Sequence, residues 1–366
     1  MPRRRLLISR SIRAAVLRQR DGPLVIEELE MEGPRDDEVL VRLVASGICR
    51  TDIDFCESGV SGPVVLGHEG AGVVDEIGKA VRGVKRGDHV VLSYQSCGCC
   101  PSCKDSRPAD CRNFWELNFG FQRLDGSNAL ERSRVRGHFF GQSSFATHAL
   151  ATERNLVKVA KTLPLDLLAP LGCGLQTGAA TVMNSLAVQA GASLAVFGTG
   201  SVGLAAVMAA RIVGADPIIG VDIHPKRLAL ARELGATHCV NAREGSVAES
   251  IRAITGSGVD HVLESTGDGA LYRVGLDLLN PGGSMALLTG GSGPGQLPDG
   301  RKVFGVIQGG AVPQRFIPYL IKLHREGRFP FDRLVTFYEF ADINQAIADA
   351  NGGDIIKPVL RMGKPG

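Results

Sequence analysis

A glycine pattern, Gly198-x-Gly200-x-x-Gly203, constrains the fold more than any other feature of this sequence. The apolar run 194–197 before it has the length of a buried strand, and residues 201–213 after it follow a helical pattern. Between a strand and a helix, such glycines permit a tight turn and close approach to a pyrophosphate, whose charge the helix N-terminus stabilises. Three glycines at this spacing can occur by chance in a chain with 47 glycines. The prediction therefore depends on the strand and the helix that flank them.

Strand and helix continue to alternate after this turn. The expected strands are 194–197, 217–221, 238–240, 259–263 and 285–288, and the expected helices between them are 201–213, 225–234, 247–254 and 270–279. Such alternation is typical of a doubly wound parallel sheet, with helices on both faces.

A dinucleotide is the ligand that this turn would hold. Its expected contacts there are Gly198, Gly200, Ser201, Val202 and Gly203. Asp222 closes the next strand, where a carboxylate accepts hydrogen bonds from an adenosine ribose and repels a 2′-phosphate. NAD is therefore the expected cofactor, and Arg227 close by keeps NADP as the alternative.

The first half of the chain has a different pattern. Residues 12–44 form short alternating segments broken by turn residues, and the same texture continues at 73–77 and 89–92. Few helical patterns precede Leu165, and a helix at 317–325 and a strand at 357–361 are expected near the end. The whole chain is therefore predicted to be α/β, with a β-rich part and a doubly wound part.

Charge and hydropathy exclude several classes of function. Lys and Arg total 41 against 38 Asp and Glu, too small an excess for a protein that binds nucleic acid by neutralising phosphates. No run of ~18 apolar residues exists, so no membrane span is expected, and we expect a soluble, cytoplasmic protein. Residues 1–13, which are Arg-rich, are predicted to form a short mobile tail, with an organelle transit sequence as the alternative.

Four of the nine cysteines crowd between Cys97 and Cys103. The residues with the spacing of a closed tetrahedral zinc shell are Cys97, Cys100, Cys103 and Cys111. Such a site leaves no open position and would be structural, with Cys99 outside it. The alternative is a set of reduced, unliganded thiols, which would oxidise readily on a polar loop.

His68 lies between Gly67 and Glu69 at the end of an apolar run, which places an imidazole beside a carboxylate. An imidazole is a good zinc ligand, although a histidine on a glycine-rich turn is the simpler interpretation. The remaining candidate ligands for a catalytic metal are Cys49 and Cys173. Two sulfurs and one nitrogen would leave zinc an open position, but spacing alone does not group them, and each cysteine taken alone is more often a small buried hydrophobe.

The segment Gly67-His68-Glu69-x2-Gly72-x5-Gly78-x2-Val81 resembles the signature of zinc-containing alcohol dehydrogenases of the medium-chain dehydrogenase/reductase superfamily. The resemblance extends over nearly the whole chain from about Ile12 and includes residues 49–52, the cysteine-rich segment, 172–174, 198–203 and 357–360. Within that superfamily, residues 139–146 and 171–178 are most similar to aryl-alcohol (benzyl-alcohol) dehydrogenases, whose relatives also take allylic terpenoid alcohols.

The resemblance implies a domain organisation. Residues 1–175 with 314–366 would form a GroES-like catalytic domain that carries a structural zinc lobe at 94–112, and residues 176–313 would form a Rossmann domain that binds NAD. Relatives pair through edge strands near 285–305, so a homodimer is expected, with a tetramer as the alternative.

The resemblance also assigns roles to single residues. The implied ligands are Cys49, His68 and Cys173 for a catalytic zinc and Cys97, Cys100, Cys103 and Cys111 for a structural zinc. Asp52 would orient the histidine, Glu69 would approach the metal during ligand exchange, and the implied cofactor contacts outside the turn are Arg50, Thr177 and Lys357. Thr51 would take the substrate proton. Many relatives have a histidine three residues further on, where this chain has Asp54, so either Asp54 or water would complete the relay.

The expected reaction is a reversible, NAD-linked oxidation of a primary alcohol to an aldehyde. The aromatic residues that fall within one span are Phe114, Trp115, Phe119, Phe121, Phe139, Phe140 and Phe145. If they face the metal they favour aryl alcohols first and allylic alcohols second, although each alone could simply pack a loop. Ser93 and Tyr94 lie where relatives line the pocket. The alternatives are a thiol-dependent formaldehyde dehydrogenase, a polyol dehydrogenase and, remotely, a zinc-ribbon binding protein.

Overall fold

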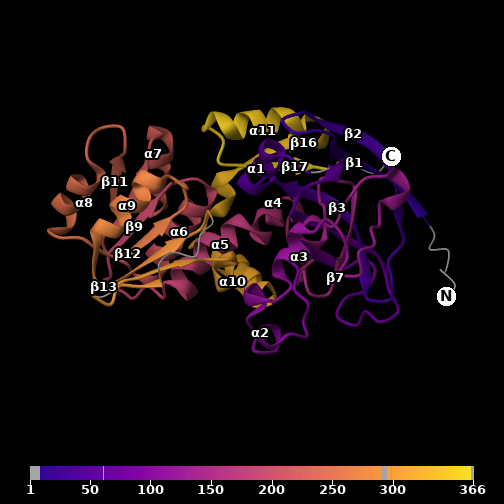
Figure 1. Ribbon diagram of the computed structural model, residues 1–366, viewed down its shortest axis with the longest axis horizontal. Helices are drawn as coiled ribbons and strands as arrows, with labels where there is room; N and C mark the ends of the chain where they lie inside the picture. Colours follow the sequence, from indigo (N-terminus) through magenta and orange to yellow (C-terminus); the bar gives the residue numbers. More distant parts are fainter. Residues whose placement is uncertain (1–8, 61, 290–294, 298, 364–366) are drawn as a thin grey trace. The chain divides into compact units, whose positions relative to one another are not determined.

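The computed structural model describes residues 9–60, 62–289, 295–297 and 299–363 (Figure 1). The chain divides into two compact units, Met1–Cys173 with Val335–Gly366, and Gly174–Leu334. The first division falls close to the expected one at 175. The second does not, because residues 314–334 belong with the second unit. There α10 (Pro313–Arg325) packs against α5 (Gly174–Ala180) and buries an apolar face that includes Ile317 and Leu320.

The described residues of the second unit form one sheet of seven strands. Its strands are β9 (Leu194–Phe197), β10 (Ile218–Asp222), β11 (His238–Asn241), β12 (Val259–Glu264), β13 (Leu279–Leu287), β14 (Gly295–Gln296) and β15 (Lys302–Gly305). Their order is β11-β10-β9-β12-β13-β15-β14, and every neighbouring pair is parallel except β14 with β15. The predicted doubly wound sheet is confirmed.

The helices of this unit begin and end at recognisable signals. They are α6 (Ser201–Val213), α7 (Pro225–Leu234), α8 (Val247–Thr255) and α9 (Gly269–Leu278), besides α5 and α10. Pro225 opens α7 where its missing N–H costs nothing, and the Ser246 hydroxyl accepts the Glu249 N–H at the start of α8. Helices α8 and α9 share a buried core with the sheet, in which Ile251 and Leu278 pack with Val262 and Met285. Parallel strands covered in this way read as continuous apolar runs, which is why the sequence located β9 to β13. It did not predict β14 and β15, and β13 begins at Leu279 rather than at the expected 285.

The first unit is β-rich, as predicted. Its strands are β1 (Ser9–Leu17), β2 (Leu24–Glu32), β3 (Glu38–Gly47), β4 (Val64–Val65), β5 (Glu69–Ile77), β6 (His89–Leu92), β7 (His148–Thr152), β8 (Leu156–Val159), β16 (Val335–Glu339) and β17 (Lys357–Arg361). One sheet has the order β16-β17-β3-β5-β6-β8 with β7 added beside β3, and the other has the order β2-β1-β4. Antiparallel pairing of β3 with β5 places Gly47 opposite Glu69, so the ends of these two strands meet.

Several short helices in the first unit are missing from the sequence prediction. The helices of this unit are α1 (Arg50–Ser58), α2 (Pro101–Lys104), α3 (Phe114–Phe119), α4 (Leu165–Leu168) and α11 (Ile343–Gly352), with short helical turns η3 (Phe139–Gly141) and η4 (Ala169–Gly172). Only Asp52 and Ile53 of α1 are buried, so this helix has little apolar periodicity to detect.

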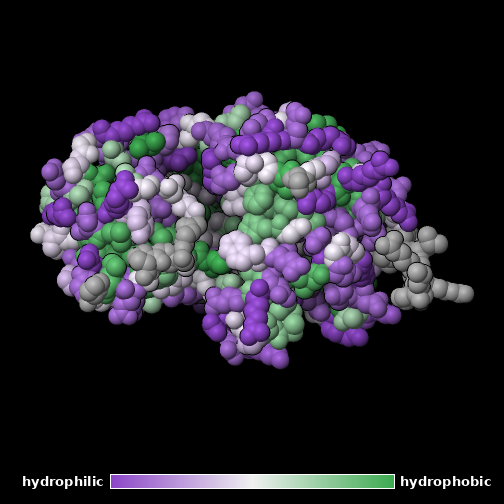
Figure 2. Space-filling view, in the orientation of Figure 1, coloured by the Kyte–Doolittle hydropathy of each residue, from purple (hydrophilic) through white to green (hydrophobic). Residues whose placement is uncertain are grey.

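The predicted mobile tail is wrong for its second part. Strand β1 begins at Ser9, and Arg10 forms ion pairs with Asp75 and Glu76. Arg3, Arg4 and Arg5 lie outside the described residues. Among the helices that the structure describes, none is long and apolar enough to cross a membrane. On the face drawn in Figure 2, hydrophilic side chains cover much of the surface, with smaller hydrophobic areas between them.

Candidate active site

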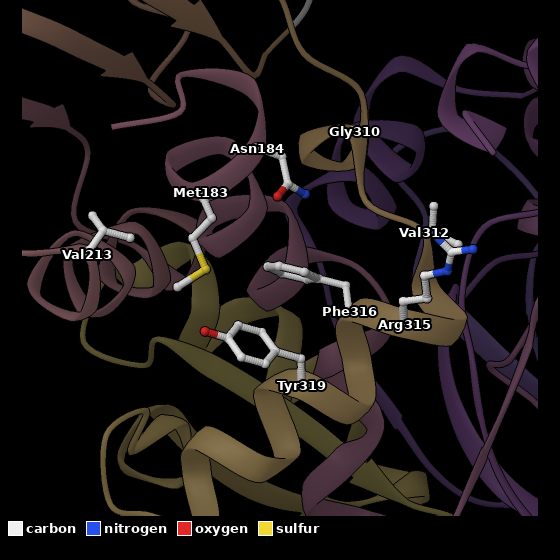
Figure 3. Close-up of a pocket in the computed structure, with 8 residues that line it drawn as sticks. All are labelled: Met183, Asn184, Val213, Gly310, Val312, Arg315, Phe316 and Tyr319. Atoms are coloured by element: carbon white, nitrogen blue, oxygen red, sulfur yellow. The ribbon is translucent and has the colours of Figure 1, made fainter. Parts of the chain in front are cut away.

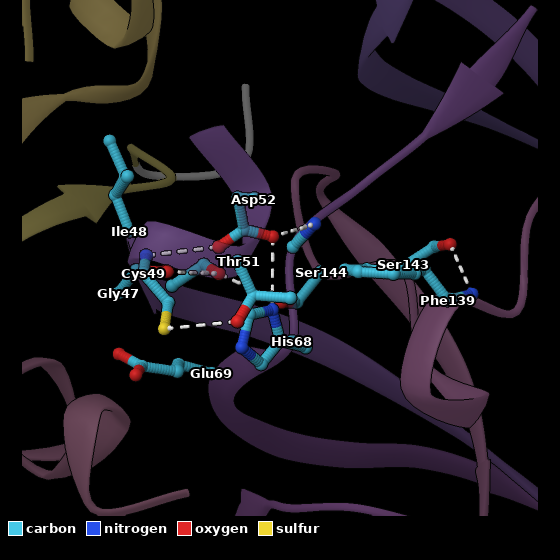
Figure 4. Close-up of polar contacts among 12 residues, drawn as sticks. Gly47, Ile48, Cys49, Thr51, Asp52, His68, Glu69, Phe139, Ser143 and Ser144 are labelled. Carbon is cyan, nitrogen blue, oxygen red and sulfur yellow. Dashed lines mark hydrogen bonds and ion pairs between the residues drawn. The ribbon is translucent and has the colours of Figure 1, made fainter. Parts of the chain in front are cut away.

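Four potential metal ligands from distant parts of the chain meet in the first unit. Cys49 precedes α1, His68 precedes β5, Glu69 begins β5, and Cys173 follows η4. One ligand atom of each lies within 4.8 Å of the others. In Figure 4 the Cys49 sulfur lies near the His68 ring, and the Glu69 carboxylate is turned away from that ring. The structure therefore brings together the ligand set that the sequence could group only by resemblance.

Asp52 fixes two of these ligands. Its Oδ1 lies 3.0 Å from His68 Nδ1 and accepts the Gly67 N–H, while its Oδ2 accepts the Cys49 N–H at 3.0 Å. The carboxylate thus bridges the backbone of one ligand and the ring of another (Figure 4). A hydrogen bond to Nδ1 turns Nε2 toward the ligand cluster, which is the usual way that a carboxylate orients a metal-binding histidine.

The donor set fits a metal ion. His68 is fully buried, and its Nε2 has no hydrogen-bond partner among the residues that the structure describes. A buried nitrogen without a partner is costly unless it is a ligand. Two sulfurs, one imidazole nitrogen and a carboxylate within reach suit zinc with a position left open for an alcohol.

The electrostatics of the cluster also favour a cation. A hydrogen bond from Cys173, with smaller contributions from His68 and Lys357, holds the pKa of the Cys49 thiol well below its usual value. Burial lowers the pKa of His68, but Asp52 and Cys49 outweigh it and raise that pKa to about 10. A metal that binds here must displace this proton from the imidazole, so binding should release protons.

Lys357 forms a buried ion pair with Glu69. Its side chain is 1% exposed, and its Nζ donates to Glu69 Oε1 and Oε2 at 3.0 Å and to the Ile48 carbonyl at 2.9 Å. An ammonium has three donors, and all three are used. The resemblance implies a contact of Lys357 with a cofactor pyrophosphate, and that contact stays a prediction; in this structure the ammonium pairs with Glu69.

Two phenylalanine rings lie against His68. The Phe140 ring stacks on the imidazole with 4.3 Å between centroids and 21° between planes, and Phe139 meets it edge-on at 5.4 Å. Phe140 has φ 52°, an uncommon conformation for a bulky residue, so the chain accepts local strain to place this ring. The aromatic group continues through Phe119 to Phe55, which sequence analysis missed because it lies on α1.

Other members of the predicted aromatic span lie elsewhere. Trp115 is 64% exposed and stacks on Phe119, whereas Phe145 is fully buried. Ser93 and Tyr94, which lie where relatives line the pocket, are both buried, and the Ser93 hydroxyl donates to the Gly172 carbonyl at 2.6 Å; their place in a substrate pocket stays a prediction.

The cysteine-rich lobe forms a second cluster. Its members, whose sulfurs lie within 4.8 Å of one another, are Cys97, Cys100, Cys103 and Cys111. The Cys97 and Cys100 N–H groups donate to sulfurs at 3.3 and 3.4 Å, which favours thiolates. Cys99 is exposed and outside the cluster, as expected. Four sulfurs and no open position suit a structural zinc.

The glycine-rich turn is closely packed and is fixed by Asp222. A Cβ on Gly203 would lie 1.8 Å from the Gly198 carbonyl oxygen, so no other residue fits there. Asp222 Oδ2 accepts the Thr199 N–H at 2.7 Å and the Thr199 hydroxyl at 2.9 Å. The sequence analysis did not single out Thr199, because the Asp222 carboxylate to which its hydroxyl donates lies on another strand. Gly200 lies near Arg227, since a Cβ there would be 3.9 Å from the guanidinium.

Comparison with known proteins agrees with this geometry. Residues 35–161 match the family model described as alcohol dehydrogenase GroES-like domain, and residues 201–320 match zinc-binding dehydrogenase. A geraniol dehydrogenase of Castellaniella defragrans is 46% identical over 364 residues, which cover 96% of this chain and 97% of the relative. The chain belongs to the zinc-containing alcohol dehydrogenases.

Two solved structures are also similar to this alcohol dehydrogenase along nearly its whole length. A benzyl alcohol dehydrogenase of Acinetobacter calcoaceticus is 42% identical, with a TM-score of 0.92 over 97% of this chain and 100% of that one. An alcohol dehydrogenase zinc-binding domain protein of Burkholderia ambifaria is 49% identical, also with a TM-score of 0.92, over 98% of this chain and 100% of that one.

The predicted relay residues of this alcohol dehydrogenase lie on α1. The Thr51 hydroxyl lies 3.9 Å from the Cys49 sulfur, close to the ligand cluster. Asp54 lies on the exposed side of the helix, where Arg50 donates to it at 2.6 Å and to Glu57 at 3.0 Å. Arg50 is expected to contact the cofactor pyrophosphate, and Asp54 is expected to complete the proton relay. In the structure these two side chains form an ion pair with each other.

A cavity of about 490 Å³ opens in the second unit of the dehydrogenase (Figure 3). Its lining residues are Met183, Asn184, Val213, Gly310, Val312, Arg315, Phe316 and Tyr319. None of the predicted site residues lines it. Thr177, an expected cofactor contact, lies instead on α5, where its hydroxyl is 3.4 Å from Gln308 Oε1.

Proposed function

We propose that this enzyme reversibly oxidises flat, apolar primary alcohols to aldehydes, with NAD as the hydride acceptor. The observation that carries the proposal is the stack of the Phe140 ring on His68, one of the proposed metal ligands. An aromatic group directly against a metal ligand favours a substrate whose hydroxyl-bearing carbon is attached to a planar group.

Cys49, His68 and Cys173 would hold the catalytic zinc, which supplies a Lewis acid that lowers the pKa of the alcohol hydroxyl. Thr51 accepts the released proton, since its hydroxyl lies beside the Cys49 sulfur. The proton then leaves to water, because Asp54 is an exposed carboxylate already paired with Arg50. Asp52 keeps the imidazole of His68 in one orientation, and Glu69 remains paired with Lys357.

NAD would bind at the glycine-rich turn. Asp222 supports NAD over NADP, because a buried carboxylate at the end of β10 repels a 2′-phosphate. The names of the two relatives, a geraniol dehydrogenase and a benzyl alcohol dehydrogenase, agree with both substrate classes and do not rank them.

NADH formation from benzyl alcohol, geraniol and ethanol, each with NAD and with NADP, tests the proposal. We expect kcat/KM to fall in that order of substrates and to be higher with NAD. A higher kcat/KM for ethanol would contradict the substrate class. A formaldehyde assay with and without glutathione separates the thiol-dependent alternative, which requires the thiol.

We further propose a cytoplasmic homodimer. The sheet of the second unit ends at β14 in the segment that the resemblance assigns to subunit pairing, and the dense cysteines suit a reducing compartment. Light scattering during size-exclusion chromatography measures the assembly, and a monomer mass would contradict it.

A further inference from the structure

His68 and Cys173, two of the proposed ligands, lie on segments that are not paired with each other as strands. A buried side chain from a third segment contacts the backbone of His68. Gln142 is 2% exposed, and its Nε2 donates to the His68 carbonyl at 2.9 Å. Its Oε1 accepts the Gly70 N–H at 3.1 Å, so the amide holds the backbone on both sides of Glu69.

Ser93 connects Gln142 to the segment that carries the other ligand, Cys173. The second N–H of Gln142 donates to the Ser93 carbonyl at 3.0 Å, and the Ser93 hydroxyl donates to the Gly172 carbonyl at 2.6 Å. Gly172 directly precedes Cys173. A Cβ on Gly172 would lie 2.1 Å from the Leu92 carbonyl oxygen, so the two backbones approach as closely as glycine allows.

We propose that Gln142 and Ser93 are positioning residues of the catalytic metal site. They set the separation between His68 and Cys173, as Asp52 sets that between Cys49 and His68. The inference rests on the proposed zinc ligands. All the polar atoms involved are buried, so a lost hydrogen bond is not replaced by water, and the backbone that carries each ligand is free to shift.

The segment that carries Gln142 is itself fixed. The Ser143 hydroxyl donates to the Val65 carbonyl at 2.6 Å. It also accepts the Phe139 N–H at 2.9 Å (Figure 4). The Ser144 N–H donates to the Gly67 carbonyl at 2.8 Å. These hydrogen bonds fix the segment that carries Gln142 independently of its contact with His68, as a positioning residue requires.

Chelator titration of the zinc-loaded enzyme tests the proposal, with zinc per chain as the readout. Gln142→Met removes the amide at similar length, and Ser93→Ala removes only one hydroxyl. Ser193→Ala is the matched control, because Ser193 is a buried serine of the second unit whose hydroxyl bonds to Asp260 at 2.8 Å. Cobalt substitution adds a spectrum that reports ligand geometry.

We expect both variants to lose one zinc at a chelator concentration about 10- to 100-fold lower than the wild type, with the second zinc retained. Their cobalt absorption bands should shift, whereas Ser193→Ala should match the wild type. Wild-type zinc retention and cobalt bands in Ser93→Ala would overturn the proposal, whether or not Gln142→Met folds. Equal weakening in Ser193→Ala would overturn it as well. Cys173→Ala that keeps both zincs would instead contradict the ligand assignment.

Discussion

The ammonium of Lys357 lies 3.0 Å from both carboxylate oxygens of Glu69, and both side chains are fully buried beside the proposed zinc ligands. Burial raises the pKa of Glu69, and Lys357 opposes that effect. Lys357 thus lowers the cost of burying this carboxylate beside the sulfurs of Cys49 and Cys173.

Lys357→Met should therefore destabilise the enzyme by about 3–5 kcal/mol, because it leaves a buried carboxylate without its cation. Urea unfolding of the zinc-loaded protein measures the effect. Lys357→Met combined with Glu69→Gln should recover part of the loss, since neither charge then remains. Unchanged stability of the single variant would show that the ion pair is not maintained in solution.

Cys97→Ser should remove the zinc of the cysteine-rich lobe and leave the catalytic zinc in place. The four sulfurs of that cluster lie within 4.8 Å of one another, so loss of one opens the shell. Zinc per chain should fall from about two to about one, with a lower temperature of unfolding. Cys99→Ser is the control, because Cys99 is exposed and outside the cluster. A matching loss in Cys99→Ser would contradict the assignment.

Local sequence signals located the second unit well and the site only in part. Strand β9 and helix α6 follow from periodicity and glycines within one short segment. The ligands Cys49, His68 and Cys173 lie far apart in the chain, so only the resemblance grouped them. The partners of Lys357 and Ser93 were not predicted for the same reason: Glu69 and Gly172 are remote in the chain, and residue type does not indicate which remote group a donor contacts.

Phe140→Ala should lower kcat/KM for benzyl alcohol by about tenfold and change that for ethanol much less. The ring covers the imidazole at 4.3 Å, and an aromatic contact contributes about 0.5–1.5 kcal/mol beyond the area it buries. Trp115→Leu is the control, because Trp115 is 64% exposed and contacts Phe119 rather than His68. An equal loss for both alcohols would assign the ring to the metal site instead of the substrate.

Thr51→Val should lower kcat by on the order of 100-fold, because it removes the hydroxyl that takes the substrate proton. Asp54→Asn should change kcat by less than about threefold, since Asp54 is exposed and paired with Arg50. Steady-state rates across pH distinguish the two. A large loss in Asp54→Asn, with a shifted pH profile, would make Asp54 the outer base of the relay.

His138 should make the first unit sensitive to mild acid. Burial, with the charges of Arg123 and Arg35, lowers the pKa of His138 to about 3, and its Nε2 accepts the Ala129 N–H, as only a neutral ring can. Unfolded histidine has a pKa of about 6.5, so between about pH 6.5 and 3 the unfolded chain binds a proton that the folded chain does not. Lowering the pH through this window favours unfolding, by about 2 kcal/mol at about pH 5.

The variant His138→Asn isolates this effect. His138 has φ 65°, a conformation that asparagine adopts more readily than most residues, so the backbone should be preserved. Unfolding free energies from urea titration near pH 7 and near pH 5 should fall less in the variant than in the wild type, by about 2 kcal/mol. Both proteins keep the same cysteines, so acid-induced loss of zinc cancels in the comparison. Equal losses in the two proteins would show that His138 is protonated in the folded state, with its imidazole reached by water.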